Sequence, residues 1–354
     1  MSRVLARAAR DVRLFALTAR PPVLMLMALT AALGTAAAGR ANDLVPFAHA
    51  LVVVLGCVVA AVAVNDLSDV AADRANALDT RPLVAGTART RQMVAVAVAG
   101  AAVALGAAAL AGPACLATVA AGLVLACGHS LPPARFAARG VVGPLLLPAG
   151  FVAVPFLSGV FAAGADTVTG RQLVLLGGLY LGFVGRLVLK DFRDVRGDAM
   201  VGKRTFLVRR GRVAACRLSA VMWLSGSVAL LGVDGLDVAT AAAFLACAAV
   251  AVRFVGELAR SGDHRADDRL VAAVATCGRG QLVVLVVHLA AVQTGVPVGG
   301  RWALVAVVAA AFVALAAVTA RTGPPAGRAI GVSARRPAPR ARRAPHPRPS
   351  GARS

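Results

Sequence analysis

The chain has 354 residues, of which 59% are hydrophobic and 15% charged, and its net charge is +22. A soluble domain could not bury so much apolar surface, and many apolar runs approach the ~20 residues that cross a ~30 Å hydrocarbon core. The basic residues are scattered between these runs, which argues against a nucleic-acid partner. The runs are continuously apolar, unlike the alternating strands of a membrane β-barrel. We expect an all-α, polytopic transmembrane helical bundle.

A basic segment, residues 1–20, comes first and carries Arg3, Arg7 and Arg10 on one helical face. It continues into the first apolar run with no cleavage signature, so we interpret it as an interfacial amphipathic segment.

Ten apolar runs follow and define a predicted transmembrane domain at 21–320. Gly112-Pro113 divides the stretch 91–130, which is too long for one crossing. The predicted helices are 21–39, 46–66, 91–111, 113–130, 141–162, 171–191, 213–232, 236–257, 278–295 and 300–320. They are rich in Ala, Gly and Val, which suits close helix packing in a membrane. The six cysteines show no CxxC spacing and are expected to be small core residues.

Positive charge is concentrated in every second loop, which predicts the orientation of the bundle. With a cytoplasmic N-terminus, the loops inside the cell carry most of the Arg and both Lys residues. These inside residues include Arg74, Arg81, Arg89, Arg135, Arg139, Lys190, Lys203, Arg212, Arg260, Arg265 and Arg269. We therefore expect a multi-pass cell-membrane protein with both termini cytoplasmic.

The last segment, 321–354, is rich in Arg, Pro and Ala and has no apolar period. This composition predicts a disordered cytoplasmic tail, which anionic membrane lipid would attract.

Two acidic clusters share one spacing. Asp66, Asp69 and Asp73 follow the second apolar run, and Asp191, Asp194 and Asp198 follow the sixth. On a helix the i, i+3, i+7 spacing places three carboxylates on one stripe. Because like charges repel, a cation must offset them. Solvated acidic helix ends are the simpler interpretation of either cluster alone, but the repeated spacing on one side of the membrane favours a shared site.

The ligand types in the two clusters predict a divalent metal. Oxygen ligands without nearby His or Cys suit Mg²⁺, whose octahedron is completed by substrate phosphate oxygens. Asn65, one helical turn before Asp69, adds a neutral carbonyl oxygen. The only two lysines, Lys190 and Lys203, bracket the second cluster and could neutralise a departing diphosphate, although ordinary inside-loop charges explain them too.

The stretches "NDLSDVAADRANALDTRPLVAG" and "KDFRDVRGDAMVGKRTF" resemble the two signature motifs of the UbiA superfamily of intramembrane prenyltransferases. The similarity in layout runs from about residue 20 to about residue 296. It implies a nine-helix bundle with a central cavity, to which our tenth helix is an addition. It also implies the transfer of a prenyl group from a polyprenyl diphosphate to an aromatic, quinone-precursor-like or other lipophilic acceptor.

The resemblance assigns roles to individual residues. It implies catalytic roles for Asp66, Asp69, Asp191, Asp194 and Asp198, and a metal set of Asn65, Asp69, Asp73, Asp194 and Asp198. Mg²⁺ is the expected cofactor, with Mn²⁺ as a second candidate. Lys190, Lys203, Arg20, Arg135 and Arg139 are the expected diphosphate-binding residues.

The sequence departs from the family pattern after the fourth helix, where "HSLPPARFAARG" places His129 and Ala137 at positions that are usually Tyr and Lys. Arg135 or Arg139 could supply the missing charge. We interpret His129 as a polar helix-end residue before a catalytic base.

Three alternatives stay open at this point. A terpene cyclase could use the same scaffold, and a membrane phosphotransferase would also use an Asp-rich helix, although its expected Asp-Gly-x-x-Ala-Arg stretch is missing. A cation transporter would carry its carboxylates near the bilayer midplane, not at helix ends beside basic loops.

Overall fold

A computed structural model describes residues 14–16, 18–75, 81–200, 202–231 and 236–323, without the side chains at 193, 194, 196 and 197. Most of the predicted segment 1–20 and of the predicted tail 321–354 therefore lies outside the described residues. The elements are α2 (Pro21–Ala37), α3 (Leu44–Ser68), α4 (Val70–Ala75), α5 (Thr90–Leu110), α6 (Pro113–Ser130), η1 (Phe136–Ala138), β1 (Arg139–Gly140), α7 (Val142–Pro148), η2 (Ala149–Ala153), α8 (Val154–Ala162), α9 (Gly170–Met200), β2 (Arg204–Thr205), α10 (Phe206–Leu231), α11 (Val238–Arg260), α12 (His264–Gln293) and α13 (Val298–Thr322).

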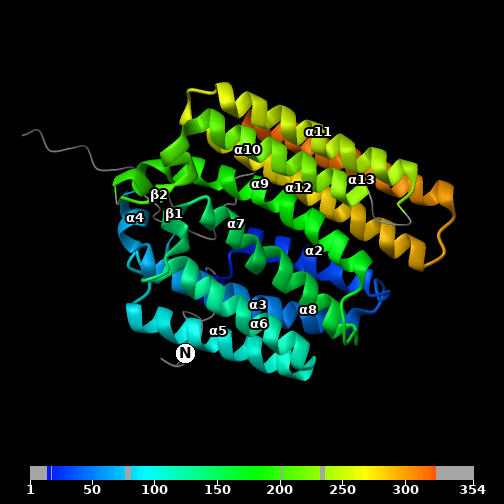
Figure 1. Ribbon diagram of the computed structural model, residues 1–354, viewed down its shortest axis with the longest axis horizontal. Coiled ribbons are helices and arrows are strands. Elements are labelled where there is room, and N and C mark those ends of the chain that lie inside the picture. The colour runs from blue at the N-terminus through cyan, green and yellow to red at the C-terminus, as the bar shows by residue number, and fades with distance from the viewer. Residues whose placement is uncertain (1–13, 17, 76–80, 201, 232–235, 324–354) are drawn as a thin grey trace, which may run out of the picture. The chain divides into compact units, whose positions relative to one another are not determined.

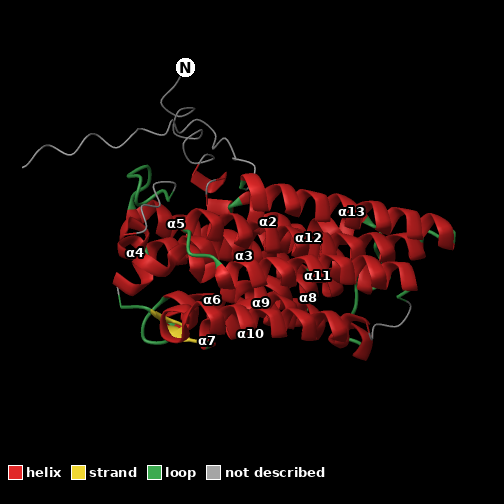
Figure 2. Ribbon diagram, turned by 90° about the horizontal axis from the view of Figure 1, so that it is seen from above, coloured by secondary structure: helices red, strands yellow, loops and turns green. Residues whose placement is uncertain are grey.

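The predicted all-α transmembrane bundle is confirmed. In the part of the chain that is described, nine helical segments are long and apolar enough to cross a membrane, and α2 is a shorter apolar helix. α7, η2 and α8 together form one of the nine, Val142–Ala162. In Figure 1, α10 to α13 lie together on one side and α3, α5, α6 and α8 on the other, with α2 and α9 between them. Figure 2 shows how little of the chain is strand.

Two predicted helix boundaries were wrong. α9 continues to Met200, nine residues past the predicted end, and so keeps the second acidic cluster helical. α12 begins at His264, although we predicted 278. Asp263 caps α12 by accepting hydrogen bonds from the backbone N–H groups of Arg265 and Ala266. The polar start of α12 is thereby stabilised as helix.

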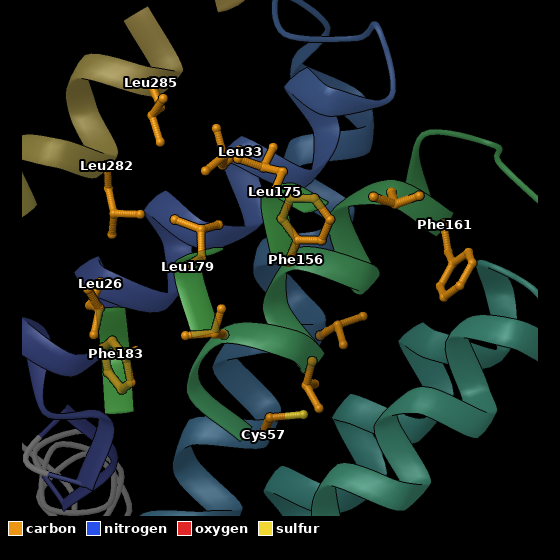
Figure 3. Packing of buried hydrophobic residues seen from close by; sticks show 14 of the residues in the cluster. Leu26, Leu33, Cys57, Phe156, Phe161, Leu175, Leu179, Phe183, Leu282 and Leu285 are labelled. Carbon is orange, nitrogen blue, oxygen red and sulfur yellow. The ribbon is translucent and has the colours of Figure 1, made fainter. Parts of the chain in front are cut away.

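Buried apolar side chains join the two sides of the bundle. Leu26 and Leu33 of α2 lie in one cluster with Leu179 and Phe183 of α9, Phe156 of α8, and Leu282 and Leu285 of α12. Figure 3 shows these side chains packed between the helices. Five cysteines are buried, as expected, but Cys127 is exposed.

Glycines allow several helix pairs to approach closely. A Cβ on Gly34 of α2 would lie 2.0 Å from the Phe156 carbonyl oxygen, and one on Gly159 of α8 would lie 2.2 Å from the Ala31 oxygen. Both distances are far below van der Waals contact, so α2 and α8 can pack this closely only because neither residue has a side chain.

We predict that Gly34→Ala destabilises the protein by about 1–3 kcal/mol, because the added methyl group forces α2 and α8 apart. Gly106→Ala in α5 is the matched control, since its Cβ would meet nothing within 4 Å. Thermal unfolding of the detergent-solubilised variants measures the effect. Equal stability of the two variants would contradict the assigned contact.

Candidate active site

The first acidic cluster lies where α3 ends. Asp66 is on the last turn of α3, Asp69 is the residue that ends it, and Asp73 is on the short helix α4. The prediction that these carboxylates share one stripe of a continuous helix was therefore wrong. The backbone at Asp69 (φ −105°, ψ 11°) leaves the helical region, and α4 starts afresh at the next residue. Asp66 pairs with Arg20, whereas Asp69 pairs with Lys203.

The second acidic cluster lies on one continuous helix, as predicted. α9 carries Asp191 at the end of the apolar span Gly170–Phe192 and Asp194 and Asp198 beyond that span. Asp198 is only 5% exposed. The side chain of Asp194 lies outside the described part of the chain, so its predicted role stays a prediction.

Lys203 connects the two clusters. Its Nζ lies 2.9 Å from Asp69 Oδ1 and 3.4 Å from Asp198 Oδ1. Gly202 adopts a left-handed conformation (φ +71°), and the Lys203 N–H donates to the Asp198 carbonyl at 2.8 Å, so the chain turns back over the end of α9. β2 then pairs with β1 in parallel, which ties this turn to the loop after α6.

The Lys203 ammonium is charged in this setting. Burial alone would lower its pKa, but the carboxylates of Asp69 and Asp198 outweigh burial and raise the pKa above its ordinary value. A cation thus lies between carboxylates that are 129 residues apart in the sequence.

Two arginines bind the other carboxylates of the first cluster. Arg20 donates a hydrogen bond to Asp66, which is 2% exposed. Arg81 lies 3.5 Å from Asp66 and 3.7 Å from Asp73. Our sequence reasoning counted Arg81 only as a loop charge. The signal for its role was its place in "RPL", directly after the first motif.

The remaining predicted basic residues differ in position. Arg135 Nη2 lies 3.8 Å from Asp69 Oδ1. Arg139 instead donates a hydrogen bond to the Pro133 carbonyl and so stabilises the loop after α6. Lys190 is exposed on α9, near the end of the apolar span Gly170–Phe192. Arg20 and Arg135 both have positive φ, a conformation that is rare outside glycine and is concentrated at functional sites.

His129 lies at the end of α6, beside this group. It is 8% exposed, its Nδ1 has no hydrogen-bond partner among the described residues, and it interacts electrostatically with Lys190, Asp69 and Lys203. It is therefore a buried helix-end residue beside the acidic clusters.

The carboxylates fit a divalent cation by their chemistry. Asp69 and Asp198 already hold a cation between them, and both offer the oxygen ligands that Mg²⁺ prefers. Among the described side chains, no three His, Cys, Asp or Glu groups lie close enough together to form a metal site. The carboxylates instead face the basic side chains of Arg20, Arg81 and Lys203.

Two pockets lie within the bundle below these carboxylates. The first, which we call the apolar pocket, has a volume of about 600 Å³ and is lined by α2, α3, α6, α7, η2 and α8, with His129 at its wall. The second, the Trp223 pocket, has a volume of about 510 Å³ and is lined by α2, η2, α9, α10, α11 and α12.

The chain is similar in sequence to two kinds of synthase. It is 31% identical over 216 residues to the digeranylgeranylglyceryl phosphate synthase of Methanopyrus kandleri, covering 59% of this chain and 74% of that protein. It is 30% identical over 114 residues to the bacteriochlorophyll synthase 34 kDa chain of Chloroflexus aurantiacus, covering 32% of this chain and only 36% of that protein.

Solved structures share the fold. A structure of digeranylgeranylglyceryl phosphate synthase matches with a TM-score of 0.58 at 14% identity, covering 78% of this chain and 98% of that one. The UbiA homologue of Archaeoglobus fulgidus, solved bound to GPP and Mg²⁺, matches with a TM-score of 0.55 at 15% identity, covering 87% and 99%. The model of the UbiA prenyltransferase family matches residues 24–276. This protein therefore belongs to the UbiA prenyltransferase family.

Proposed function

We propose that the protein transfers a prenyl group from a polyprenyl diphosphate to a lipophilic acceptor and releases diphosphate, with Mg²⁺ as cofactor. The observation that carries this proposal is the shared cation: Lys203 lies between Asp69 of the first cluster and Asp198 of the second. The binding of GPP and Mg²⁺ by the Archaeoglobus fulgidus homologue supports it.

The metal-holding residues of the proposal are Asn65, Asp69, Asp73, Asp194 and Asp198, and Mn²⁺ is a second candidate ion. When bound, Mg²⁺ supplies positive charge that stabilises the leaving diphosphate. Five basic residues surround the same place and would hold the diphosphate oxygens: Arg20, Arg81, Arg135, Lys190 and Lys203. Arg139 keeps the Arg135 loop in position through its bond to Pro133.

In the proposed transfer, one bond to prenyl C1 breaks and another forms. The bond between prenyl C1 and the diphosphate oxygen breaks, and both electrons leave with the diphosphate. An electron pair of the acceptor forms the new bond to C1, and the acceptor then loses a proton to the departing diphosphate. The basic residues stabilise the charge that develops on the leaving group.

The apolar pocket suits the prenyl chain. Val58 and Val62 line it on α3, and Asp66 follows Val62 by one helical turn, so the pocket leads directly to the carboxylates. Its lining is apolar apart from His129, which keeps water away from an allylic cation.

We also propose that the acidic clusters and both termini face the cytoplasm. The arginines and lysines of the site belong to the loops that the positive-inside rule assigns to that side. An enzyme in this orientation would receive its diphosphate substrate from the cytoplasm.

We predict that diphosphate release from a prenyl diphosphate stops in EDTA and returns when Mg²⁺ is added in excess. Membranes containing the protein are incubated with prenyl diphosphates of several lengths and a panel of acceptors, and phosphate is measured after pyrophosphatase treatment. Release that persists unchanged in EDTA would contradict the metal assignment. A cyclised hydrocarbon product formed without an acceptor would instead identify a terpene cyclase.

We predict that Asp69→Asn and Asp198→Asn each lower the rate of prenyl transfer by about 10²-fold or more, because each removes one side of the cation site. Asp166→Asn, at an exposed loop position between α8 and α9, is the control and should keep nearly full activity. Radiolabelled prenyl transfer is measured beside ion flux in proteoliposomes. Loss of flux with no loss of transfer activity would favour the transporter alternative.

A further inference from the structure

The short ribbon of β1 and β2 places two arginines side by side at one end of the bundle (Figure 1). The strands are parallel, with Arg139 opposite Arg204 and Gly140 opposite Thr205. Neighbouring strands lie ~4.8 Å apart, and paired residues project to the same face of a ribbon. Arg139 and Arg204 are both exposed, so two positive side chains leave one face together.

Arg209 brings a third guanidinium group to this ribbon. A Cβ on Gly140 would lie 3.1 Å from Arg209 Nη1, so the guanidinium group rests against the Gly140 backbone. Arg209 is also exposed, in the first turns of α10. We call Arg139, Arg204 and Arg209 the ribbon arginines.

No carboxylate balances the ribbon arginines among the described residues. Arg204 and Arg209 form no ion pair or hydrogen bond there. Arg139 has only neutral partners, since it donates to the Pro133 carbonyl and lies over the Phe136 ring, 5.9 Å from the ring centre. Other arginines do pair with carboxylates, namely Arg20, Arg81, Arg135 and Arg212. Because like charges held close together repel, an anion from outside the chain would stabilise the ribbon.

Arg204 points away from the acidic clusters. Successive residues of an extended chain project to opposite sides. Lys203 is buried and reaches Asp69 and Asp198, Arg204 is exposed, and Thr205 is buried again. An anion bound by Arg204 is therefore separate from the diphosphate that we assign to the acidic clusters.

Exposed apolar side chains flank the ribbon and indicate contact with lipid. Val141 follows β1 directly and Val208 lies in the first turn of α10, and each is 37% exposed. The apolar span Val142–Ala162 begins two residues after β1, and the span Phe206–Leu231 begins directly after β2. The ribbon thus lies where two membrane-spanning segments start. Basic side chains beside apolar ones are typical of a surface that contacts anionic lipid headgroups.

We propose that the ribbon arginines bind the phosphate group of an anionic phospholipid, whose acyl chains lie against Val141 and Val208. Arginine suits this ligand because one guanidinium group can donate two parallel hydrogen bonds to a phosphate. A phosphate shared by Arg139 and Arg204 offsets part of the repulsion between them.

The bound lipid also stabilises the pairing of β1 with β2. β1 belongs to the loop after α6, and β2 directly follows Lys203, so the pairing ties the Lys203 turn to that loop. We therefore expect anionic lipid to speed prenyl transfer. This consequence, unlike the lipid site itself, rests on the proposed function.

Native mass spectrometry of the full chain in detergent tests the lipid site. The protein is titrated with phosphatidylglycerol or with phosphatidylcholine of the same acyl chains, and the Kd of the first bound lipid is measured. We expect phosphatidylglycerol to bind at least tenfold more tightly, and Arg204→Gln to weaken its binding about fivefold. Arg265→Gln is the matched control, since it removes an exposed basic charge at the start of α12, and should change the Kd less than twofold.

Four results of this titration would overturn the proposal. They are equal affinity for the two lipids, an unchanged Kd in Arg204→Gln, an equal loss in Arg204→Gln and Arg265→Gln, and displacement of phosphatidylglycerol by an equal concentration of inorganic phosphate. The third result would show a general attraction between basic charge and lipid. The fourth would show a site for free phosphate.

Thermal unfolding separates lipid binding from a structural role of Arg204. In phosphatidylcholine nanodiscs we expect Arg204→Gln to unfold at the same temperature as the unchanged protein or higher, because one repelling charge is gone. Phosphatidylglycerol should raise the unfolding temperature of the unchanged protein but not that of the variant. A variant that is equally destabilised in both lipids would overturn the proposal.

Prenyl transfer in the same nanodiscs tests the consequence for activity. We expect the unchanged protein to work about threefold faster in phosphatidylglycerol than in phosphatidylcholine, and Arg204→Gln to work equally fast in both. Equal rates for the unchanged protein would overturn the link between lipid and site. A protein that transfers no prenyl group in either lipid lacks the proposed function, and the lipid titration still decides whether the ribbon binds the phospholipid.

Discussion

The site depends on one electrostatic constraint, which is that carboxylates from two distant segments must share cations. Asp69 ends α3 and Asp198 lies near the end of α9, and without positive charge between them they would repel. Lys203 lies within 3.4 Å of both carboxylates. The length of α9, the left-handed turn at Gly202 and the pairing of β1 with β2 all serve to bring that ammonium group back to the carboxylates.

Close helix packing connects this polar end to the apolar interior. Gly34 and Gly159 allow α2 to lie against α8. α2 and η2 line both pockets, and α8 lines the apolar pocket. The same contacts that stabilise the bundle therefore shape the compartments. Substrates would meet where these compartments approach the carboxylates, away from bulk water.

Much of the fold could be predicted from the sequence, because membrane-spanning helices are recognisable by composition alone. The errors arose where polar residues continue a helix. α12 starts early because Asp263 caps it and because Arg212 forms a bidentate ion pair with the buried Asp267, at 2.8 and 2.7 Å. The acidic triples were visible as a spacing, but the break at Asp69 was not. The role of Arg81 and the Trp223 pocket depend on which helix faces meet, which a single sequence does not reveal.

The most direct test of this account is a structure of the protein with Mg²⁺ and a non-reactive prenyl thiolodiphosphate in lipid nanodiscs. The account predicts metal and diphosphate between Asp69 and Asp198, with the prenyl chain in the apolar pocket. A diphosphate bound elsewhere, or density for Mg²⁺ that contacts neither carboxylate, would contradict it.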